Sequence, residues 1–294
     1  MVPEQVFANT PTVLRPDQRA HFYDEGYLAI PALLDKKTVG ELRAIMQRSI
    51  ESSADPKGPD NQFDFEAGHS PESPKLRRVA YVDDLDSECW RFCADSIIAD
   101  IAADLLGPNL RFREVFINFK WAGGGAEVKW HQDIVFYPHT NTRTCQFLIA
   151  LEDISLEQGP LQVIPGSHKG PIFEHYDEQG NWTGAMRDSD MITAGAENAI
   201  ALTGPAGSMT VHHSCMIHGS DQNLSDKGRP VFVITYTAAD AIPYTAVPYP
   251  SSHYGTLVRG VEPGYAQHEA MCVPMPPDWS GGYTSIFAHQ EERE

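Results

Sequence analysis

The chain of 294 residues has little of what a membrane protein or a secreted protein needs. No apolar run approaches the roughly 20 residues that cross a bilayer. Its first residues, MVPEQVFANTPTVLRPDQ, lack the basic segment and the following apolar segment of a secretory signal. Basic residues are also scarce, because 22 Lys and Arg stand against 40 Asp and Glu, for a net charge of −18. This charge repels phosphate backbones and anionic lipids, so we expect a cytoplasmic protein that binds neither nucleic acid nor membrane.

The chain also contains few cysteines. The five cysteines are an odd number, are scattered along the chain and show no CxxC spacing. This pattern excludes a disulfide framework and a thiolate zinc site, and we expect reduced packing residues. With 41% apolar residues the chain can bury a sizeable core, and we expect one domain over residues 1–294.

The first third of the chain carries helical patterns. Apolar residues recur every three to four positions over about 36–50, which predicts an amphipathic helix. Further helices are expected over 16–26 and 86–106, and an apolar strand over 27–30. Residues 51–74 are rich in Ser, Asp, Pro and Gly and predict a long loop. Residues 14–110 are therefore expected to form a helical buttress with a loop.

From residue 110 the apolar period changes to two, as in strands. Alternation would place Phe112, Glu114, Phe116, Asn118 and Lys120 on one face of the first strand. Further strands are expected over 128–136, 144–152, 160–164, 199–203, 207–213 and 230–237. Short strands after helices predict a mainly β fold with flanking helices, a double-stranded β-helix of the jelly-roll or cupin-like type, over 111–238. The Pro-, Tyr- and Gly-rich residues 241–294 would form an irregular tail that lies over the barrel as a lid.

The densest group of metal-binding residue types is Trp130-His131-Gln132-Asp133. In a strand, His131 and Asp133 would point to the same side. A second histidine from a distant strand, within 211–220, would complete the facial triad of non-haem Fe(II) oxygenases, which leaves one face of the ion open for a co-substrate and dioxygen. Three histidines are available there, His212, His213 and His218. Downstream, the guanidinium of Arg229 provides a planar fork suited to a carboxylate.

Several ordered motifs make the chain resemble the phytanoyl-CoA dioxygenase family. The similarity spans about residues 14–238, and its motifs are Phe22 to Leu28, Trp130 to Asp133, Ile149 to Asp153, Gly159 to His168, and His218-Gly219-Ser220 with Asn223 and Arg229. The family comprises Fe(II)- and 2-oxoglutarate-dependent oxygenases. The resemblance thus implies Fe(II) as cofactor, with 2-oxoglutarate and dioxygen as co-substrates.

The resemblance also implies roles for individual residues. His131, Asp133 and His218 would hold the iron, because Gly219-Ser220 and Arg229 keep the family's spacing from His218. Arg229 would bind the distal carboxylate of 2-oxoglutarate. Further co-substrate contacts are expected from Asn118, Lys120 and Gln146, although relatives often carry a smaller hydroxyl residue at the last position.

The sequence therefore predicts a dioxygenase that hydroxylates a C–H bond of a small-molecule metabolite and releases succinate and CO2. The carboxylate of Asp133 favours hydroxylation, desaturation, ring closure or epimerisation over halogenation, because halogenases that resemble this family lack it. Two alternatives stay open at this stage: a non-catalytic barrel that binds a small molecule, and a zinc hydrolase with the same ligands. The hydrolase gives no reason for Arg229, and an HExxH motif is absent.

Overall fold

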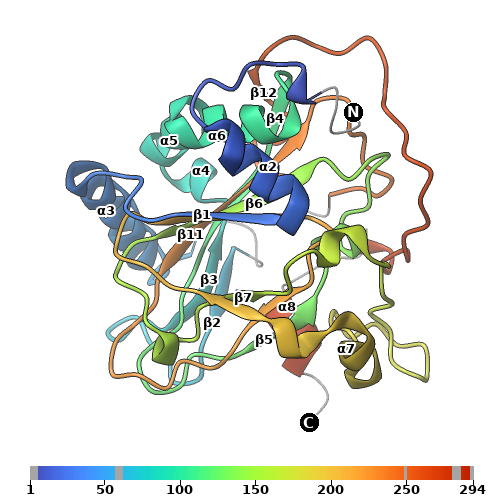
Figure 1. Ribbon diagram of the computed structural model, residues 1–294. Coiled ribbons are helices and arrows are strands. Elements are labelled where there is room, and N and C mark those ends of the chain that lie inside the picture. Colours follow the sequence, from blue (N-terminus) through green and yellow to red (C-terminus); the bar gives the residue numbers. More distant parts are fainter. Residues whose placement is uncertain (1–5, 57–61, 248–249, 280–285, 292–294) are drawn as a thin grey trace.

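Two antiparallel sheets form the centre of the computed structural model, which describes residues 6–56, 62–247, 250–279 and 286–291 (Figure 1). The larger sheet has the strand order β1-β9-β6-β11-β4-β3-β2, with β12 beside β4. Its strands are β1 (Tyr27–Ile30), β2 (Phe63–Phe65), β3 (Leu76–Ala80), β4 (Leu110–Asn118), β6 (Thr144–Ala150), β9 (Met209–His213), β11 (Val231–Ala238) and β12 (Leu257–Arg259). The smaller sheet has the order β5-β10-β7-β8. Its strands are β5 (Val128–His131), β7 (Leu161–Val163), β8 (Ile200–Leu202) and β10 (His218–Ser220).

Helices from the first third of the chain cover the outer face of the larger sheet (Figure 1). They are α2 (Pro16–Glu25), α3 (Lys36–Ser52), α4 (Val82–Leu85), α5 (Ser87–Asp95) and α6 (Ile97–Leu106). Two more helices, α7 (Asp188–Ala194) and α8 (Ile286–Glu291), lie by the smaller sheet (Figure 1). The predicted class, mainly β with flanking helices, is confirmed.

Local chemistry sets the helix ends. The carboxylate of Asp35 accepts the Thr38 N–H at 2.8 Å and begins α3, as the amphipathic pattern predicted. The single helix predicted over 86–106 is wrong, because Ser96 has extended backbone, ends α5 and accepts the Ile98 N–H to begin α6. The predicted stop at Gly107 is confirmed.

The central strand β11 is buried on both faces. Phe232, Ile234 and Tyr236 pack into the core beneath the helices, whereas Val231 and Val233 face a cavity between the sheets. This burial explains the continuous apolar sequence of the strand. Among the described residues, no helix is both long enough and apolar enough to span a membrane.

A β-bulge in β4 changes the predicted alternation. Thr235 and Tyr236 are neighbours in β11, but they pair with Glu114 and Phe112, so that Arg113 is the additional residue. Phe112 consequently lies in the helix-side core, and its predicted place on the face of Glu114 is wrong. Arg113 and Glu114, although consecutive, both line the cavity.

Other segments also differ from the predicted elements. The strand predicted over 128–136 ends at His131 and is followed by the 3₁₀ turn η1 (Asp133–Val135). The predicted loop over 51–74 contains β2, while 57–61 lie outside the described residues. The predicted irregular tail includes the short elements β12 and α8.

Three histidines resist protonation, of which His139 and His175 are buried and His213 is partly buried. Burial lowers the pKa of His139 to about 4, with a further contribution from Arg113. Burial also lowers the pKa of His175 and of His213 to about 3. In the unfolded chain a histidine titrates near pH 6.5. Between this pH and about pH 4 the unfolded state therefore binds more protons than the folded state, and the stability decreases as the pH falls.

We expect the free energy of unfolding of the metal-free protein to fall below pH 6.5, by about 1.4 kcal/mol per pH unit for each of these histidines. Urea unfolding between pH 7 and pH 5 measures this slope. The variant His213→Phe should show a slope smaller by one histidine's share. A free energy that is constant over this range would contradict the account.

Candidate metal centre and co-substrate pocket

His131 and His218 are direct cross-strand partners. They end β5 and begin β10, two antiparallel strands in which the Cα atoms of these two residues are paired. Their ring centroids lie 4.1 Å apart. One strand pairing therefore brings together two imidazoles that are separated by more than 80 positions in the chain.

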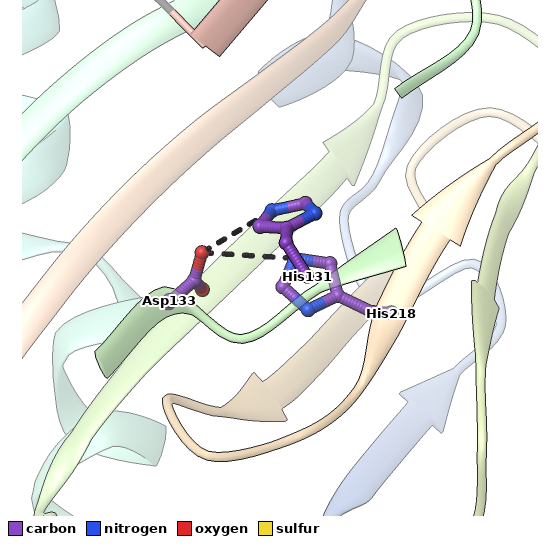
Figure 2. Close-up of side chains that lie close together, drawn as sticks. All are labelled: His131, Asp133 and His218. Atoms are coloured by element: carbon purple, nitrogen blue, oxygen red, sulfur yellow. Dashed lines mark ion pairs between the residues drawn. The ribbon is translucent and has the colours of Figure 1, made fainter. Parts of the chain in front are cut away.

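Asp133 completes the cluster from the turn that follows β5 (Figure 2). Its Oδ1 lies 3.6 Å from Nε2 of His131 and 3.7 Å from Nε2 of His218. Each residue offers one ligand atom within 4.8 Å of the other two, and all three residues are buried. The predicted convergence of His131 and Asp133 thus arises from a strand end and a 3₁₀ turn rather than from one continuous strand.

The outer nitrogens of the two imidazoles are already engaged. Nδ1 of His131 lies 2.8 Å from the carbonyl of Lys129, and Nδ1 of His218 lies 2.9 Å from the carbonyl of Met216. Because a carbonyl accepts a hydrogen bond, Nδ1 carries the proton and Nε2 presents its lone pair to the centre. Two such nitrogens and one carboxylate oxygen fit a divalent metal ion with an open face.

Charges in the cluster favour the ligating protonation states. Burial raises the pKa of Asp133, but the neighbouring histidines outweigh it and hold this pKa well below its usual range. Burial, reinforced by His131 and His212, keeps the pKa of His218 well below that of an ordinary histidine. An anionic carboxylate and a neutral imidazole are the forms that bind metal.

The other two candidate histidines have different surroundings. Nε2 of His212 lies 3.1 Å from Oδ2 of Asp133, and His212 is not among the three residues whose ligand atoms gather within 4.8 Å of one another. His213 faces the opposite direction, where its Nδ1 accepts the Cys215 N–H and its ring lies near Phe22. The structure therefore brings His218, as the resemblance implied, together with His131 and Asp133.

Arg229 lies in the wall of the same cavity. Its side chain is only 5% exposed, and Nε is buried with no partner. No hydrogen bond or ion pair engages its guanidinium within the part of the chain that the structure describes. Burial alone lowers the pKa of Arg229 to about 10, which leaves it charged at neutral pH. A buried cation without a counter-charge is destabilising, and an anion bound in the cavity would provide the missing counter-charge.

Asn118 and Gln146 also line the cavity. Oδ1 of Asn118 is buried without a partner, and Nε2 of Gln146 donates to the Tyr137 hydroxyl at 3.2 Å. Both amides therefore lie on the larger sheet, in the wall of the cavity that also contains His131, Asp133 and His218.

Lys120 does not line this cavity, although its backbone pairs with that of Arg229. Its Nζ donates to the carbonyls of Ser220 and Asp221, which follow His218 in the chain, and it lies in the wall of a second cavity. Burial, together with the nearby charge of Arg229, lowers the pKa of Lys120 to about 6. Its amine supports the segment that carries His218 and does not face the metal cluster.

Sequence reasoning missed part of the cavity wall. Arg113 enters through the bulge in β4, and its guanidinium lies 4.0 Å from the centre of the Tyr137 ring. A bulge leaves no periodic signal in a single sequence. The tail, which was predicted to lie over the barrel, contributes further lining residues, namely Val247, Pro250, Ser251, Trp279, Ile286 and Phe287.

Comparison with known proteins identifies the family. The model of the phytanoyl-CoA dioxygenase (PhyH) family matches residues 22–231. The chain belongs to this family. A probable alpha-ketoglutarate-dependent hypophosphite dioxygenase of Stutzerimonas stutzeri is 35% identical over 234 residues, which cover 77% of this chain and 80% of that protein. The L-proline trans-4-hydroxylase of Streptomyces griseoviridis is 29% identical and covers 77% of this chain and 88% of its own.

Solved structures share the fold. EctD from S. alaskensis, determined with 2-oxoglutarate and 5-hydroxyectoine, superposes with a TM-score of 0.68 at 21% identity and covers 92% of each chain. The carbocyclase SnoK from nogalamycin biosynthesis gives a TM-score of 0.63 at 23% identity, over 79% of this chain and 88% of its own. The predicted cupin-like jelly roll is confirmed.

The family assignment made from the sequence is confirmed as well, and with it the class of enzyme. The chain is a non-haem iron oxygenase that depends on 2-oxoglutarate and acts on a small molecule. The alternatives of a non-catalytic barrel and a zinc hydrolase are set aside.

The geometry predicts one Fe(II) per chain. Replacing His218 by Ala should weaken Fe(II) binding by more than about 100-fold, since loss of a ligand exceeds the 10–100-fold loss typical of outer contacts. Anaerobic calorimetry measures this affinity. His168→Ala is the matched control, because His168 lies outside the cluster and contacts the carbonyl of Tyr23. Undiminished binding by His218→Ala would show that another histidine is the ligand.

Proposed function

We propose that His131, Asp133 and His218 hold Fe(II), that Arg229 binds the distal carboxylate of 2-oxoglutarate, and that the enzyme hydroxylates a small metabolite. The unpaired guanidinium of Arg229 carries this proposal, because it lies in the cavity that also contains the metal cluster. A metal site alone would suit several reactions. A metal site with a buried cation that lacks an anion is suited to a co-substrate that chelates the metal and carries a second carboxylate.

Iron and 2-oxoglutarate together supply the oxidant: one oxygen atom of dioxygen enters succinate, the other enters the hydroxylated product, and CO2 leaves. The chain orients the reactants. Arg229 is fixed through two backbone hydrogen bonds with Lys120, of 2.8 and 3.3 Å. Asn118 provides a further amide for the co-substrate, and Phe116, Phe136 and Val233 keep water from this part of the cavity.

The remaining polar wall is proposed to bind the substrate. Nη1 of Arg113 donates to Glu114, while Nε is buried without a partner and the guanidinium stacks on Tyr137. Hypophosphite and L-proline, named for two relatives, are small molecules with an anionic group. We therefore propose a small substrate whose anionic group binds Arg113.

We also propose a location for the enzyme, the absence of a nucleic-acid partner and a role for the C-terminal residues, as the sequence predicted. The net charge of −18 supports an enzyme without a nucleic-acid partner, and we further propose a cytoplasmic location. The places of Pro250, Ser251, Trp279 and Phe287 in the cavity wall support a lid formed by residues 241–294 within one domain.

Arg229→Ala should weaken 2-oxoglutarate binding by roughly 10²–10⁴-fold, because two charge-assisted hydrogen bonds of about 1.5–3 kcal/mol each are lost. Arg229→Lys should fall between wild type and Ala, since lysine keeps the charge without the fork. Fe(II) affinity should be unchanged. Calorimetry measures the affinities of the wild type and the variants for Fe(II) and for 2-oxoglutarate. Equal 2-oxoglutarate affinity in wild type and Arg229→Ala would falsify the proposed role of Arg229.

The role of Arg113 can be tested by substrate-stimulated succinate release. Metabolites with and without an anionic group are screened on wild type, and Arg113→Gln should raise the KM of the anionic substrates by about 10-fold or more. Succinate release without substrate should be similar in both proteins. An unchanged KM for the best anionic substrate would contradict this role.

A further inference from the structure

The two carboxylate oxygens of Asp133 have different neighbours. Oδ1 faces Nε2 of His131 and Nε2 of His218, at 3.6 and 3.7 Å. Oδ2 lies 3.1 Å from Nε2 of His212. His212 is 1% exposed and belongs to β9, which lies between β1 and β6 in the larger sheet. The metal-facing side of the carboxylate and its hydrogen-bonded side are thus held by different sheets.

The direction of this hydrogen bond follows from its partners. A carboxylate oxygen accepts, so Nε2 of His212 donates and carries the ring's proton. Nδ1 is then an acceptor, and it is buried without a partner. A buried acceptor without a donor is destabilising. Among the described residues, the imidazole of His212 therefore makes a hydrogen bond to Asp133 through Nε2, while its Nδ1 has no partner.

We propose that His212 is a positioning residue that keeps Asp133 bound to the metal through one oxygen, an inference that rests on the proposed function. An octahedral ion would take His131, Asp133 and His218 as ligands on one face and leave the opposite face for the two donor atoms of 2-oxoglutarate and for dioxygen. If Asp133 bound through both of its carboxylate oxygens, the second oxygen would occupy one of the positions on that open face. The hydrogen bond from His212 would hold Oδ2 away from the ion and keep that position open.

His212 is close to the metal ligands but is not one of them. His131, Asp133 and His218 offer atoms within 4.8 Å of one another, and His212 is not part of this group. Its Nε2 is engaged by Oδ2, and its ring lies beside that of His218 with centroids 4.1 Å apart. Mutation of a residue that hydrogen-bonds to a metal ligand typically weakens metal binding by about 10–100-fold.

The neighbouring residue His213 provides a matched control. It is a partly buried histidine of the same strand, but its side chain points to the opposite face and contacts neither Asp133 nor the cavity. The test compares His212→Phe, His212→Gln and His213→Phe with wild type. Phenylalanine fills the space of the ring without a donor. Glutamine places an amide nitrogen the same number of bonds from the backbone as Nε2 of histidine.

The readouts are the affinity for Co(II), the coordination number reported by Co(II) absorption, and the 2-oxoglutarate affinity of the Co(II) protein, all without turnover. Thermal unfolding of the metal-free variants shows that each is folded. We expect His212→Phe to lose about 10–100-fold in Co(II) affinity and to bind 2-oxoglutarate more weakly. His212→Gln should stay within a few-fold of wild type, and His213→Phe should match wild type.

Each other outcome overturns the inference in a recognisable way. If His212→Phe binds Co(II) and 2-oxoglutarate like wild type, the side chain only fills space. If His212→Gln fails as severely as His212→Phe, the N–H donor is not what matters. If either variant loses metal as completely as His131→Ala, His212 is a ligand. Failure of wild type to bind Co(II) would instead refute the proposed function on which the inference rests.

Discussion

The pairing of His131 with His218 across β5 and β10 is the constraint on which the rest of the site depends. Successive side chains of a strand point to opposite faces, so a shift of one residue in this register would turn one imidazole out of the cavity. Both strands are short, with four and three residues. Their register is supported by the contact between β10 and β7 and by the amine of Lys120, which binds the carbonyls after His218.

The larger sheet provides polar side chains that complement the paired histidines His131 and His218. Its strand β9 contributes His212 beneath Asp133, and the extension of the β4–β11 pair fixes Arg229 opposite Lys120. These buried polar groups are not fully paired: Nε of Arg229, Oδ1 of Asn118 and Nδ1 of His212 all lack partners. The helix-covered core on the other face of the sheet stabilises the frame that holds them. Unpaired groups that gather in one cavity indicate where a ligand binds.

Much of this arrangement could be predicted from the sequence. Short strand-like segments bounded by turn residues predicted β4, β6, β9 and β11, and the ordered motifs around His131 and His218 predicted the group of potential metal ligands. The motif spacing was sufficient to predict these residues, because each motif is a short continuous segment and His218 and Arg229 lie close together in the sequence.

Other features depend on contacts that a single sequence does not encode locally. The carboxylate of Asp133 reaches the site from a 3₁₀ turn, not from a strand, and the bulge at Arg113 reverses the alternation. The strand β10 has only three residues, too few for a periodic pattern. The division at Ser96 was missed because apolar periodicity continues across it, although serine is a common residue at the start of a helix.

The central claim is that one cavity binds Fe(II) and 2-oxoglutarate together, with the keto acid on the open face of the metal. Visible absorption of the anaerobic wild-type protein, loaded with one Fe(II) per chain and titrated with 2-oxoglutarate, tests it most directly. The account predicts a weak charge-transfer band of the chelated keto acid, which saturates at one 2-oxoglutarate per iron and disappears when dioxygen is admitted. Iron that binds at one per chain but gives no such band with saturating 2-oxoglutarate would contradict the account.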